Sequence, residues 1–197
     1  MLEFLYNIDL SIFHFINSTM ANPVFDLIMP IITSVKFWMP IYIVSLALLI
    51  WKGGTKGRIL ALVLIVGIVL SDQTNSTFLK SLFDRERPCH TVETARLLIG
   101  CPGGKSFPSS HAFNNFCAAL IISMFYSDKK WIFLSIAGLI AFTRPYCGVH
   151  YPSDILAGAV LGSIMGYILA ISAQKLAKKY LKYDVFELKS PQNQSSS

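Results

Sequence analysis

Long apolar runs separated by short polar segments dominate the pattern of this chain. Five runs approach the roughly 20 residues that a helix needs to cross about 30 Å of hydrocarbon. We expect them as membrane-spanning helices at residues 35–51, 57–80, 109–126, 130–145 and 153–173. The pattern therefore predicts an all-α fold, a polytopic transmembrane helical bundle with five spans, or six if the N-terminal region supplies another.

The first 33 residues have a different pattern. Leu5, Ile8, Ile12 and Phe15 recur at spacings of three and four, which is the apolar stripe of a helix. Residues 24–32 repeat the pattern. Two amphipathic helices lying in the membrane interface explain it, and one irregular span is the competing interpretation.

These patterns divide the chain into three parts. Residues 1–33 form N-terminal amphipathic or interfacial helices, residues 34–176 form a transmembrane domain, and residues 177–197 form a polar cytoplasmic tail. The tail is rich in Pro, Gln and Ser towards its end, which is typical of disorder.

Composition supports a membrane protein. Of the 197 residues, 53% are hydrophobic and 14% are charged, and the mean hydropathy is +0.53. A soluble domain carries nearer to a quarter of charged residues. The net charge of +6 is scattered between the apolar runs rather than gathered on one basic face, so we expect no nucleic-acid partner.

The second apolar run ends with two cations. Lys80 and Arg87 are seven residues apart, and Pro88 follows. If the helix continues to Arg87, the two lie on one face about 10 Å apart, at a rise of about 1.5 Å per residue, and the proline ends the helix. Arginine suits bidentate phosphate contact and lysine acts as a point charge. The alternative is two basic side chains that snorkel at a helix end.

The third run starts with Pro108-Ser109-Ser110-His111. Proline in the first turn and serine just before it are typical of a helix start, where free backbone N–H groups bind anions. A helix cap explains the serines without any function. His111 is placed to protonate an oxygen that leaves a bound phosphate, although a histidine here can also be structural.

A histidine and a carboxylate open the last run. His150 and Asp154 are four apart, so they can meet on one helix face. A carboxylate that accepts from one imidazole nitrogen fixes the tautomer and leaves the other nitrogen as a nucleophile. Arg144 ends the preceding run, and a tight loop returns the chain towards His150. A buried structural His–Asp pair is the alternative.

Two further features receive structural interpretations. Gly158, Gly162 and Gly166 form a stripe of small residues that lets a neighbouring helix approach closely. The four cysteines lack metal spacing, and we expect no metal site. Cys89 and Cys101 share one loop, where a disulfide can form. Cys147 lies on the same face, so the pairing stays open.

The loops on the two sides differ in basic residues. Ten Lys or Arg residues fall on one side and seven on the other, and the side with ten is expected to be cytoplasmic. All three polar clusters then face the opposite, extracytoplasmic side. We interpret the chain as an integral protein of a bacterial inner membrane whose site faces the periplasm or exterior.

Together, these clusters resemble the type 2 phosphatidic acid phosphatase family, the lipid phosphate phosphatases related to vanadium haloperoxidases, in a small bacterial form. The family pattern is Lys-x6-Arg-Pro, then Pro-Ser-Gly-His, then Ser-Arg-x5-His-x3-Asp. This chain keeps the order and all internal spacings, as Lys80-x6-Arg87-Pro88, Pro108-Ser109-Ser110-His111 and Thr143-Arg144-x5-His150-x3-Asp154. Ser110 replaces the glycine and Thr143 replaces the serine.

The resemblance implies a role for each matching residue. His150 attacks phosphorus and forms a phosphohistidine, Asp154 orients it, and His111 protonates the leaving oxygen and then activates water. The phosphate is expected to be held by Lys80, Arg87, Ser109, Ser110 and Arg144. Arg96 and Lys105, in the loop between the first two clusters, are expected to read the lipid head group. No metal or other cofactor is expected, because three fixed cations supply the positive charge.

The predicted function is an integral-membrane lipid phosphatase, with a phosphorylated lipid in the bilayer as its partner. Undecaprenyl diphosphate is the favoured substrate, ahead of a lipid A phosphate or phosphatidylglycerophosphate. A lipid phosphotransferase is one alternative. A non-catalytic protein that binds or transports phospholipids is another, but binding alone does not require two histidines and a carboxylate.

Overall fold

The computed structural model describes residues 2–186, which contain helices and no β-strand. The all-α prediction is therefore confirmed. The helices are α1 (Leu2–His14), α2 (Pro23–Ile32), α3 (Val35–Lys52), α4 (Gly54–Gln73), α5 (Lys80–Phe83), α6 (Pro88–Thr91), α7 (Ser110–Phe125), α8 (Lys130–Tyr146) and α9 (Pro152–Leu176). Short π or 3-10 turns extend or join them at η1 (Phe15–Thr19), η2 (Thr74–Leu79), η3 (Ser127–Lys129) and η4 (Ala177–Leu181).

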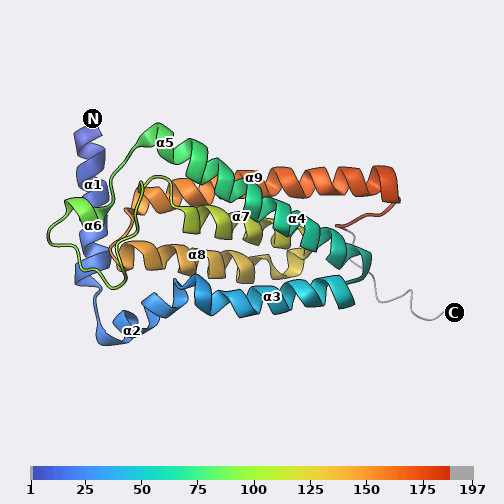
Figure 1. Ribbon diagram of the computed structural model, residues 1–197, viewed down its shortest axis with the longest axis horizontal. Helices are drawn as coiled ribbons and strands as arrows, with labels where there is room; N and C mark the ends of the chain where they lie inside the picture. The colour runs from blue at the N-terminus through green and yellow to red at the C-terminus, as the bar shows by residue number, and fades with distance from the viewer. Residues whose placement is uncertain (1, 187–197) are drawn as a thin grey trace.

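The five long predicted runs are all helical and lie side by side. Helices α3, α4, α7, α8 and α9 follow the long axis of the molecule, with α7 packed against α4, α8 and α9 (Figure 1). Helix α1 crosses one end of this bundle, and α5, α6 and their loops lie at that same end (Figure 1). The chain connections between α3 and α4 and between α7 and α8 lie at the opposite end.

The predicted number of spans is not confirmed. Three helical segments are long and apolar enough to cross a membrane: Val35–Lys52, Gly54–Thr91 and Pro152–Leu181. The N-terminal pair Glu3–Thr19 and Pro23–Ile32, bent by 113°, makes a fourth if it is one broken span. Helices α7 and α8 have only 16 and 17 residues. Length and composition thus support three or four spans rather than five or six.

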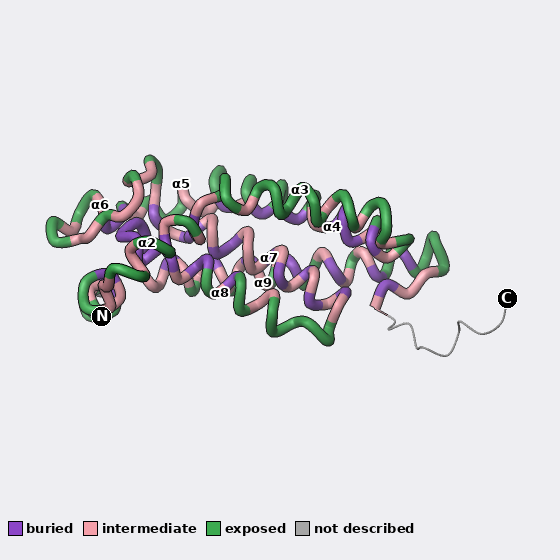
Figure 2. Tube along the Cα trace, turned by 90° about the horizontal axis from the view of Figure 1, so that it is seen from below, coloured by how far each residue is buried: buried purple, intermediate pink, exposed green. Residues whose placement is uncertain are grey.

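Large apolar side chains cover the outside of the bundle. Helix α3 is apolar along most of its length, yet none of its residues is buried (Figure 2). Such a surface is unfavourable in water, and hydrocarbon is the solvent that matches it. The exposed apolar helices point to a membrane protein.

The glycine stripe of α9 is structural, as predicted. A Cβ at Gly158 would lie 2.7 Å from the Ser109 carbonyl oxygen, and one at Gly166 would lie 2.6 Å from that of Cys117. At Gly162 the added carbon would collide with the backbone of Phe113. Contact between α7 and α9 therefore depends on these glycines, and it sets the distance between the two helix starts that carry polar clusters.

Residues near each end of the described part of the chain are attached to the bundle. Buried Asn17 donates from Nδ2 to the carbonyl oxygens of Arg96, at 2.9 Å, and Tyr146, at 2.8 Å. At the other end, the Val185 N–H donates to Oε1 of Gln174 at 2.8 Å, and the Val185 side chain is buried. Residues 187–197 of the predicted polar tail lie outside the described residues.

Candidate active site

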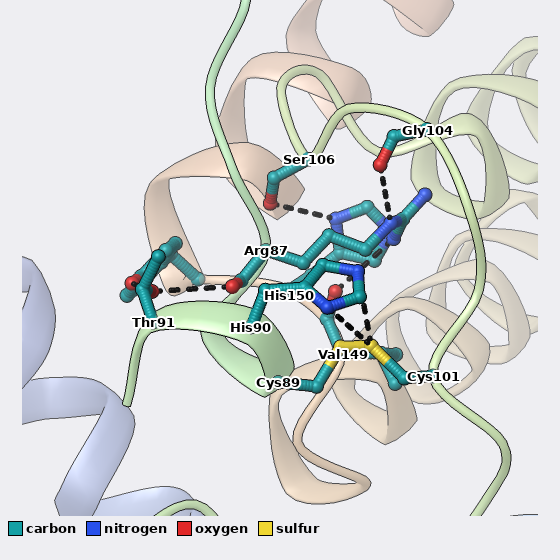
Figure 3. Close-up of a disulfide and its surroundings, with 10 residues drawn as sticks. Arg87, Cys89, His90, Thr91, Cys101, Gly104, Ser106, Val149 and His150 are labelled. Carbon is teal, nitrogen blue, oxygen red and sulfur yellow. Dashed lines mark hydrogen bonds between the residues drawn. A yellow bond between two sulfur atoms is a disulfide. The ribbon is translucent and has the colours of Figure 1, made fainter. Parts of the chain in front are cut away.

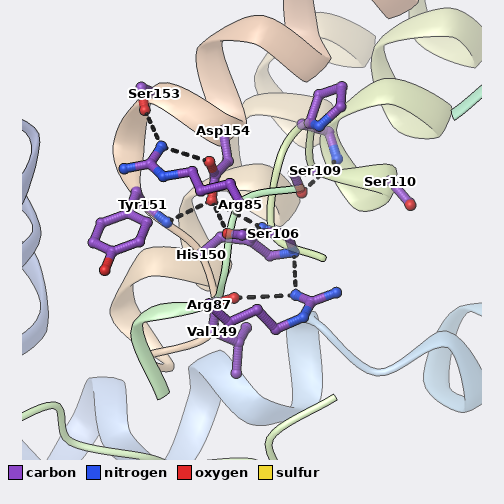
Figure 4. Close-up of polar contacts among 12 residues, drawn as sticks. Arg85, Arg87, Ser106, Ser109, Ser110, Val149, His150, Tyr151, Ser153 and Asp154 are labelled. Atoms are coloured by element: carbon purple, nitrogen blue, oxygen red, sulfur yellow. Dashed lines mark hydrogen bonds and ion pairs between the residues drawn. The ribbon is translucent and has the colours of Figure 1, made fainter. Parts of the chain in front are cut away.

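The three polar clusters meet at the end of the bundle crossed by α1. The segment after α5 passes in front of the start of α9, and the start of α7 lies beside them (Figure 4). The residues that contribute polar groups here come from separate parts of the chain: Arg85, Arg87, Ser106, Ser109, His150, Ser153 and Asp154.

His150 is fixed through both ring nitrogens. It lies in the loop between α8 and α9 and is 2% exposed. Its Nδ1 lies 3.3 Å from Oδ2 of Asp154, and its Nε2 lies 2.8 Å from Nη1 of Arg87. A guanidinium group donates hydrogen bonds and accepts none, so Nε2 accepts from Arg87. The ring proton is then on Nδ1, which donates to Asp154, and the lone pair is on Nε2.

The surroundings keep this imidazole neutral. Burial lowers the pKa of His150 to about 4, and the opposing influence of Asp154 only partly offsets it. The charges of Arg87 and Arg144 lower the pKa further. A neutral imidazole with a free Nε2 lone pair is the form that attacks an electrophile.

Asp154 accepts hydrogen bonds on both carboxylate oxygens. Oδ2 accepts from the Tyr151 N–H at 2.8 Å, from the Ser106 hydroxyl and from His150, and Oδ1 accepts from Nη1 of Arg85 at 2.8 Å. The side chain is fully buried and lies in the first turn of α9, where the helix dipole favours negative charge. This carboxylate is fixed in orientation and charge.

Arg87 is held by the backbone on two sides. Its Nε donates to the carbonyl oxygen of Gly104, and Nη1 donates to that of Val149, both at 3.1 Å. The side chain is buried. The guanidinium group is therefore directed at Nε2 of His150 by two different loops.

The helix does not continue to Arg87, so the condition for a shared helix face with Lys80 is not met. Helix α5 ends at Phe83, and Asp84 follows in the left-handed conformation with φ of 47°. Arg87 is extended, with ψ of 152°, because a residue before proline disfavours the helical conformation. Lys80 and Arg87 therefore do not share a helix face, although Lys80 remains close enough to sense the charges of Arg87, Arg144 and Asp154.

The start of α7 adjoins His150. Ser109 caps the helix, with Oγ accepting from the Ala112 N–H, and its own N–H donates to the carbonyl oxygen of Asp154 at 3.1 Å. Since Oγ acts as an acceptor in the cap, its proton is still able to donate. Ser110 Oγ accepts from Nδ2 of Asn75 at 2.8 Å. His111 lies within electrostatic range of His150, Arg144 and Arg87.

Arg144 has an unused donor. The side chain is 5% exposed, and Nη1 donates to Oγ1 of Thr33 at 2.7 Å, but Nε is buried without a partner. A buried donor that lacks an acceptor costs about 1–3 kcal/mol, and more when it is charged. An anion placed beside Arg144 and Arg87 would supply the missing acceptor.

The two head-group candidates are paired with carboxylates. Arg96 binds Asp26, and Nζ of Lys105 lies 2.8 Å from Oδ1 of Asp84. Within residues 2–186, no such ion pair involves Lys80, Arg87 or Arg144. Among the predicted site cations, the positive charge left for a ligand is therefore that of Lys80, Arg87 and Arg144.

Sequence reasoning missed four residues that contact this centre. Arg85 and Ser106 bind Asp154, and Asp9 and Ser153 bind Arg85. Arg85 lies two residues before Arg87 in the same basic segment, which was the one available signal. Ser106 lies in a loop, Ser153 in the first turn of α9 and Asp9 in α1, and no spacing identifies them.

The pairing of the cysteines is settled in the structure. Cys89 and Cys101 form a disulfide, and Cys147 is a buried free thiol. The disulfide closes residues 89–101 into a loop, and Gly104, whose carbonyl oxygen binds Arg87, lies three residues beyond it. His90 lies against the sulfur of Cys101 at 3.4 Å (Figure 3). Cys89, His90 and Cys101 are the one group of metal-binding dimensions found among the described residues, but the two sulfurs are bonded to each other.

Comparison with known proteins gives a consistent result. The family model described as PAP2 superfamily matches residues 57–178. A lipid A 4'-phosphatase of Bacteroides thetaiotaomicron is 32% identical over 91% of this chain and 83% of its own length. The undecaprenyl-diphosphatase BcrC of Bacillus subtilis is 32% identical over 75% of this chain and 74% of its own. The crystal structure of Aquifex aeolicus LpxE superposes with a TM-score of 0.61 at 28% identity, covering 89% of this chain and 96% of that one.

Proposed function

Because the chain belongs to the PAP2 superfamily, whose curated relatives are lipid phosphatases, we propose that its site hydrolyses the phosphate of a lipid head group through a phosphohistidine on His150. The observation that carries the proposal is the arrangement of that imidazole. Nδ1 faces the carboxylate of Asp154, and the lone pair of Nε2 faces the guanidinium of Arg87. A nucleophile thus points at the group best suited to hold its target.

The reaction has two steps. In the first, Nε2 of His150 bonds to phosphorus, the ester P–O bond breaks, and the lipid oxygen takes a proton from His111. In the second, His111 removes a proton from water, the water oxygen bonds to phosphorus, and the P–N bond breaks to release inorganic phosphate. Asp154 stabilises the imidazolium that forms in between.

The phosphate oxygens require fixed positive charge more than covalent help, because phosphoryl transfer depends on alignment and charge stabilisation. Lys80, Arg87 and Arg144 provide that charge, and the unpartnered Nε of Arg144 has a donor ready. The Ser109 hydroxyl and the backbone near Ser110 add donors at the start of α7.

A single phosphate fits this charge distribution best. Arg96 and Lys105 are already neutralised by Asp26 and Asp84, so a second phosphate would compete with carboxylates for them. A lipid A phosphomonoester is therefore our first candidate substrate, in keeping with the relative that covers 91% of the chain. Undecaprenyl diphosphate, favoured from the sequence, is the second candidate, in keeping with the BcrC relative.

The basic loops support an extracytoplasmic site. The connections at residues 52–58 and 127–130 and the end of α9 lie at the end of the bundle opposite the site (Figure 1). The positive-inside rule assigns that end to the cytoplasm. We accordingly assign the site to the outer surface of the inner membrane.

The test is phosphate release from a panel of lipids by purified protein in detergent. The panel holds a lipid A phosphate, undecaprenyl diphosphate and phosphatidylglycerophosphate. We expect the wild type to release phosphate from at least one of these lipids. The rate of release should fall by a factor of about 10³ or more in His150→Ala. Lipid binding should largely survive in that variant. Equal release by the variant, or no release from any lipid, would refute the proposal. A phosphorylated acceptor in place of free phosphate would indicate a phosphotransferase.

A further inference from the structure

One arginine joins two carboxylates from opposite ends of the sequence. Nη1 of Arg85 lies 2.8 Å from Oδ1 of Asp154, and its Nη2 lies 2.7 Å from Oδ2 of Asp9 (Figure 4 shows the contact with Asp154). Asp9 belongs to α1, outside the segment 57–178 that matches the family model. The N-terminal helix, for which the sequence indicated an interfacial amphipathic helix or part of an irregular span, is thus linked through Arg85 to the carboxylate that contacts His150.

Asp9 also binds the start of α9 directly. Its Oδ1 accepts from the Ser153 N–H at 2.9 Å, and its Oδ2 accepts from the Ser153 hydroxyl. An acidic group that accepts an N–H in the first turn is a favourable helix cap. The side chain of Asp9 is only 9% exposed, so solvent screens this contact weakly.

Arg85 is constrained on every side. Its guanidinium carbon lies 3.9 Å from the centre of the Tyr151 ring, and Nη1 also donates to Oγ of Ser153 at 2.7 Å. Its carbonyl oxygen accepts from the Ser106 N–H at 2.7 Å, and the hydroxyl of Ser106 binds Asp154. The side chain is 23% exposed. Arg85 therefore holds both oxygens of Asp154. Its guanidinium binds Oδ1 directly, and its carbonyl oxygen positions Ser106, whose hydroxyl binds Oδ2.

We propose that Asp9 and Arg85 are positioning residues for the reaction at His150: Arg85 holds Asp154 in place and limits its negative charge, and Asp9 limits the positive charge of Arg85. The inference rests on the proposed function for its kinetic consequence. Neither residue touches the reacting atoms. Both act through Asp154, which fixes the tautomer of His150 and stabilises its cation.

The two residues have opposite effects on the proton affinity of His150. The charged and titratable groups around this ring are Arg87 from the segment after α5, His111 from α7, Arg144 from α8 and Asp154 from α9. Behind Asp154 lie Arg85 and then Asp9. Removing the charge of Arg85 leaves Asp154 more negative, which favours protonated His150. Removing the charge of Asp9 leaves Arg85 to neutralise Asp154 more completely, and this disfavours protonated His150.

The test measures the titration of His150 directly. Full-length protein labelled with ¹³C at histidine Cε1 is titrated by NMR in detergent, and His150→Gln assigns the signal among the four histidines. We expect the His150 midpoint to rise by about half a pH unit in Arg85→Gln and to fall in Asp9→Asn. Arg85→Lys, which keeps the charge, should stay nearer to wild type than Arg85→Gln.

The matched control is Asp26→Asn. Asp26 also ties the N-terminal region to the bundle through an arginine, Arg96, but that pair does not contact Asp154. Loss of the Asp26–Arg96 ion pair should leave the titration midpoint of His150 at the wild-type value, even if the unfolding temperature of the protein falls. A purely structural role for Asp9 predicts that Asp9→Asn and Asp26→Asn behave alike.

The kinetic arm uses phosphate release from the lipid that the wild type hydrolyses. We expect kcat to fall about 10-fold or more in Asp9→Asn and Arg85→Gln, with KM changing less. Midpoints that do not move, that move in the same direction, or that move without a fall in kcat would overturn the inference. A wild type that releases phosphate from no lipid would instead refute the proposed function, and the NMR titration would still decide whether these residues set the charge of His150.

Discussion

Nη1 of Arg87 lies 2.8 Å from Nε2 of His150, the ring nitrogen turned away from Asp154. In this arrangement the guanidinium group covers the lone pair that attacks phosphorus in the proposed reaction. We propose that a phosphate bound by Arg87 takes over that donor and stands directly in front of Nε2. Binding of the anion and release of the nucleophile therefore occur through the same contact.

This relationship predicts a large effect of a conservative substitution. Arg87→Lys keeps the charge but loses the fork that binds Gly104, Val149 and His150 together. We expect kcat/KM for phosphate release to fall about 10- to 100-fold, the equivalent of roughly 1.5–3 kcal/mol for charged hydrogen bonds.

Arg58→Lys is the control for that substitution. Arg58 lies at the start of α4, where its Nε donates to the carbonyl oxygen of Ile50 at 3.2 Å, at the far end of the bundle. We expect wild-type kcat/KM in this variant. An Arg87→Lys enzyme as active as Arg58→Lys would contradict the role given to the guanidinium fork.

The sequence was sufficient for the helices and for the residues with regular spacing. The length of the apolar runs located all five long helices. The spacing of four residues predicted contact between His150 and Asp154 on one helix face. The contact forms, although His150 lies in the loop just before α9 and only Asp154 is in the helix. Helical spacing did not describe Lys80 and Arg87. Asp84 is in the left-handed conformation and Arg87 is extended before a proline, so the helix ends before it reaches Arg87.

The contacts of Asp154 with Arg85, Ser106 and, through Arg85, with Asp9 could not be predicted. They depend on loops and on a helix crossing whose partners are up to 144 residues apart, as between Asp9 and Ser153. Periodicity describes only neighbours along one element. The number of spans is not confirmed, because α7 and α8 have only 16 and 17 residues and burial within a bundle makes a helix as apolar as lipid contact does.

The disulfide is expected to support the phosphate site. It joins Cys89 and Cys101, which lie near the two ends of the segment from Arg87 to its partner Gly104. Opening this loop gives it more conformational freedom and loosens one of the two backbone anchors of Arg87. We expect the double substitution Cys89→Ser with Cys101→Ser to raise KM for the lipid about 3- to 10-fold, with a smaller change in kcat.

Reductant provides the matched control. Treatment of the wild type should reproduce the higher KM, whereas the double variant should not respond. Steady-state phosphate release with and without reductant measures both. A wild-type KM that does not respond to verified reduction of the bond would contradict this role.

Close packing of α7 and α9 predicts a strong effect at one glycine. A Cβ at Gly162 would collide with the Phe113 backbone, whereas one at Gly138 in α8 would meet nothing within 4 Å. We expect Gly162→Ala to destabilise the protein by about 1–3 kcal/mol and Gly138→Ala to be neutral or stabilising by up to about 1 kcal/mol. Thermal unfolding in detergent compares them, and equal midpoints would show that the helix contact does not need the glycine.

If His150 is the nucleophile, as proposed, its proton affinity should set the acid limit of activity. Burial lowers the pKa of this imidazole to about 4 from a usual value of 6.5. The ring of the folded protein therefore stays neutral between pH 6.5 and about pH 4. We expect kcat/KM to stay nearly constant as the pH falls from 7 to about 5 and to decline below that. Below the usual pKa the unfolded chain binds a proton that the folded one does not, so this histidine contributes less stability as the pH falls towards 4.

The measurement is the pH profile of kcat/KM for the free enzyme, corrected for the ionisation of the lipid phosphate by ³¹P NMR. An acid limb centred near pH 6.5 after this correction would mean that His150 titrates as an exposed histidine does. That outcome would contradict the buried, neutral nucleophile described above.

The most direct test of the account is to trap the covalent intermediate. Protein mixed with ³²P-labelled lipid substrate is quenched in alkali within a turnover, and the labelled peptide is sequenced by mass spectrometry. We predict an acid-labile, alkali-stable phosphate on His150 that is absent from His150→Gln. Phosphate release at the wild-type rate with no label on His150, or with the label on another residue, would contradict the claim that this imidazole attacks phosphorus.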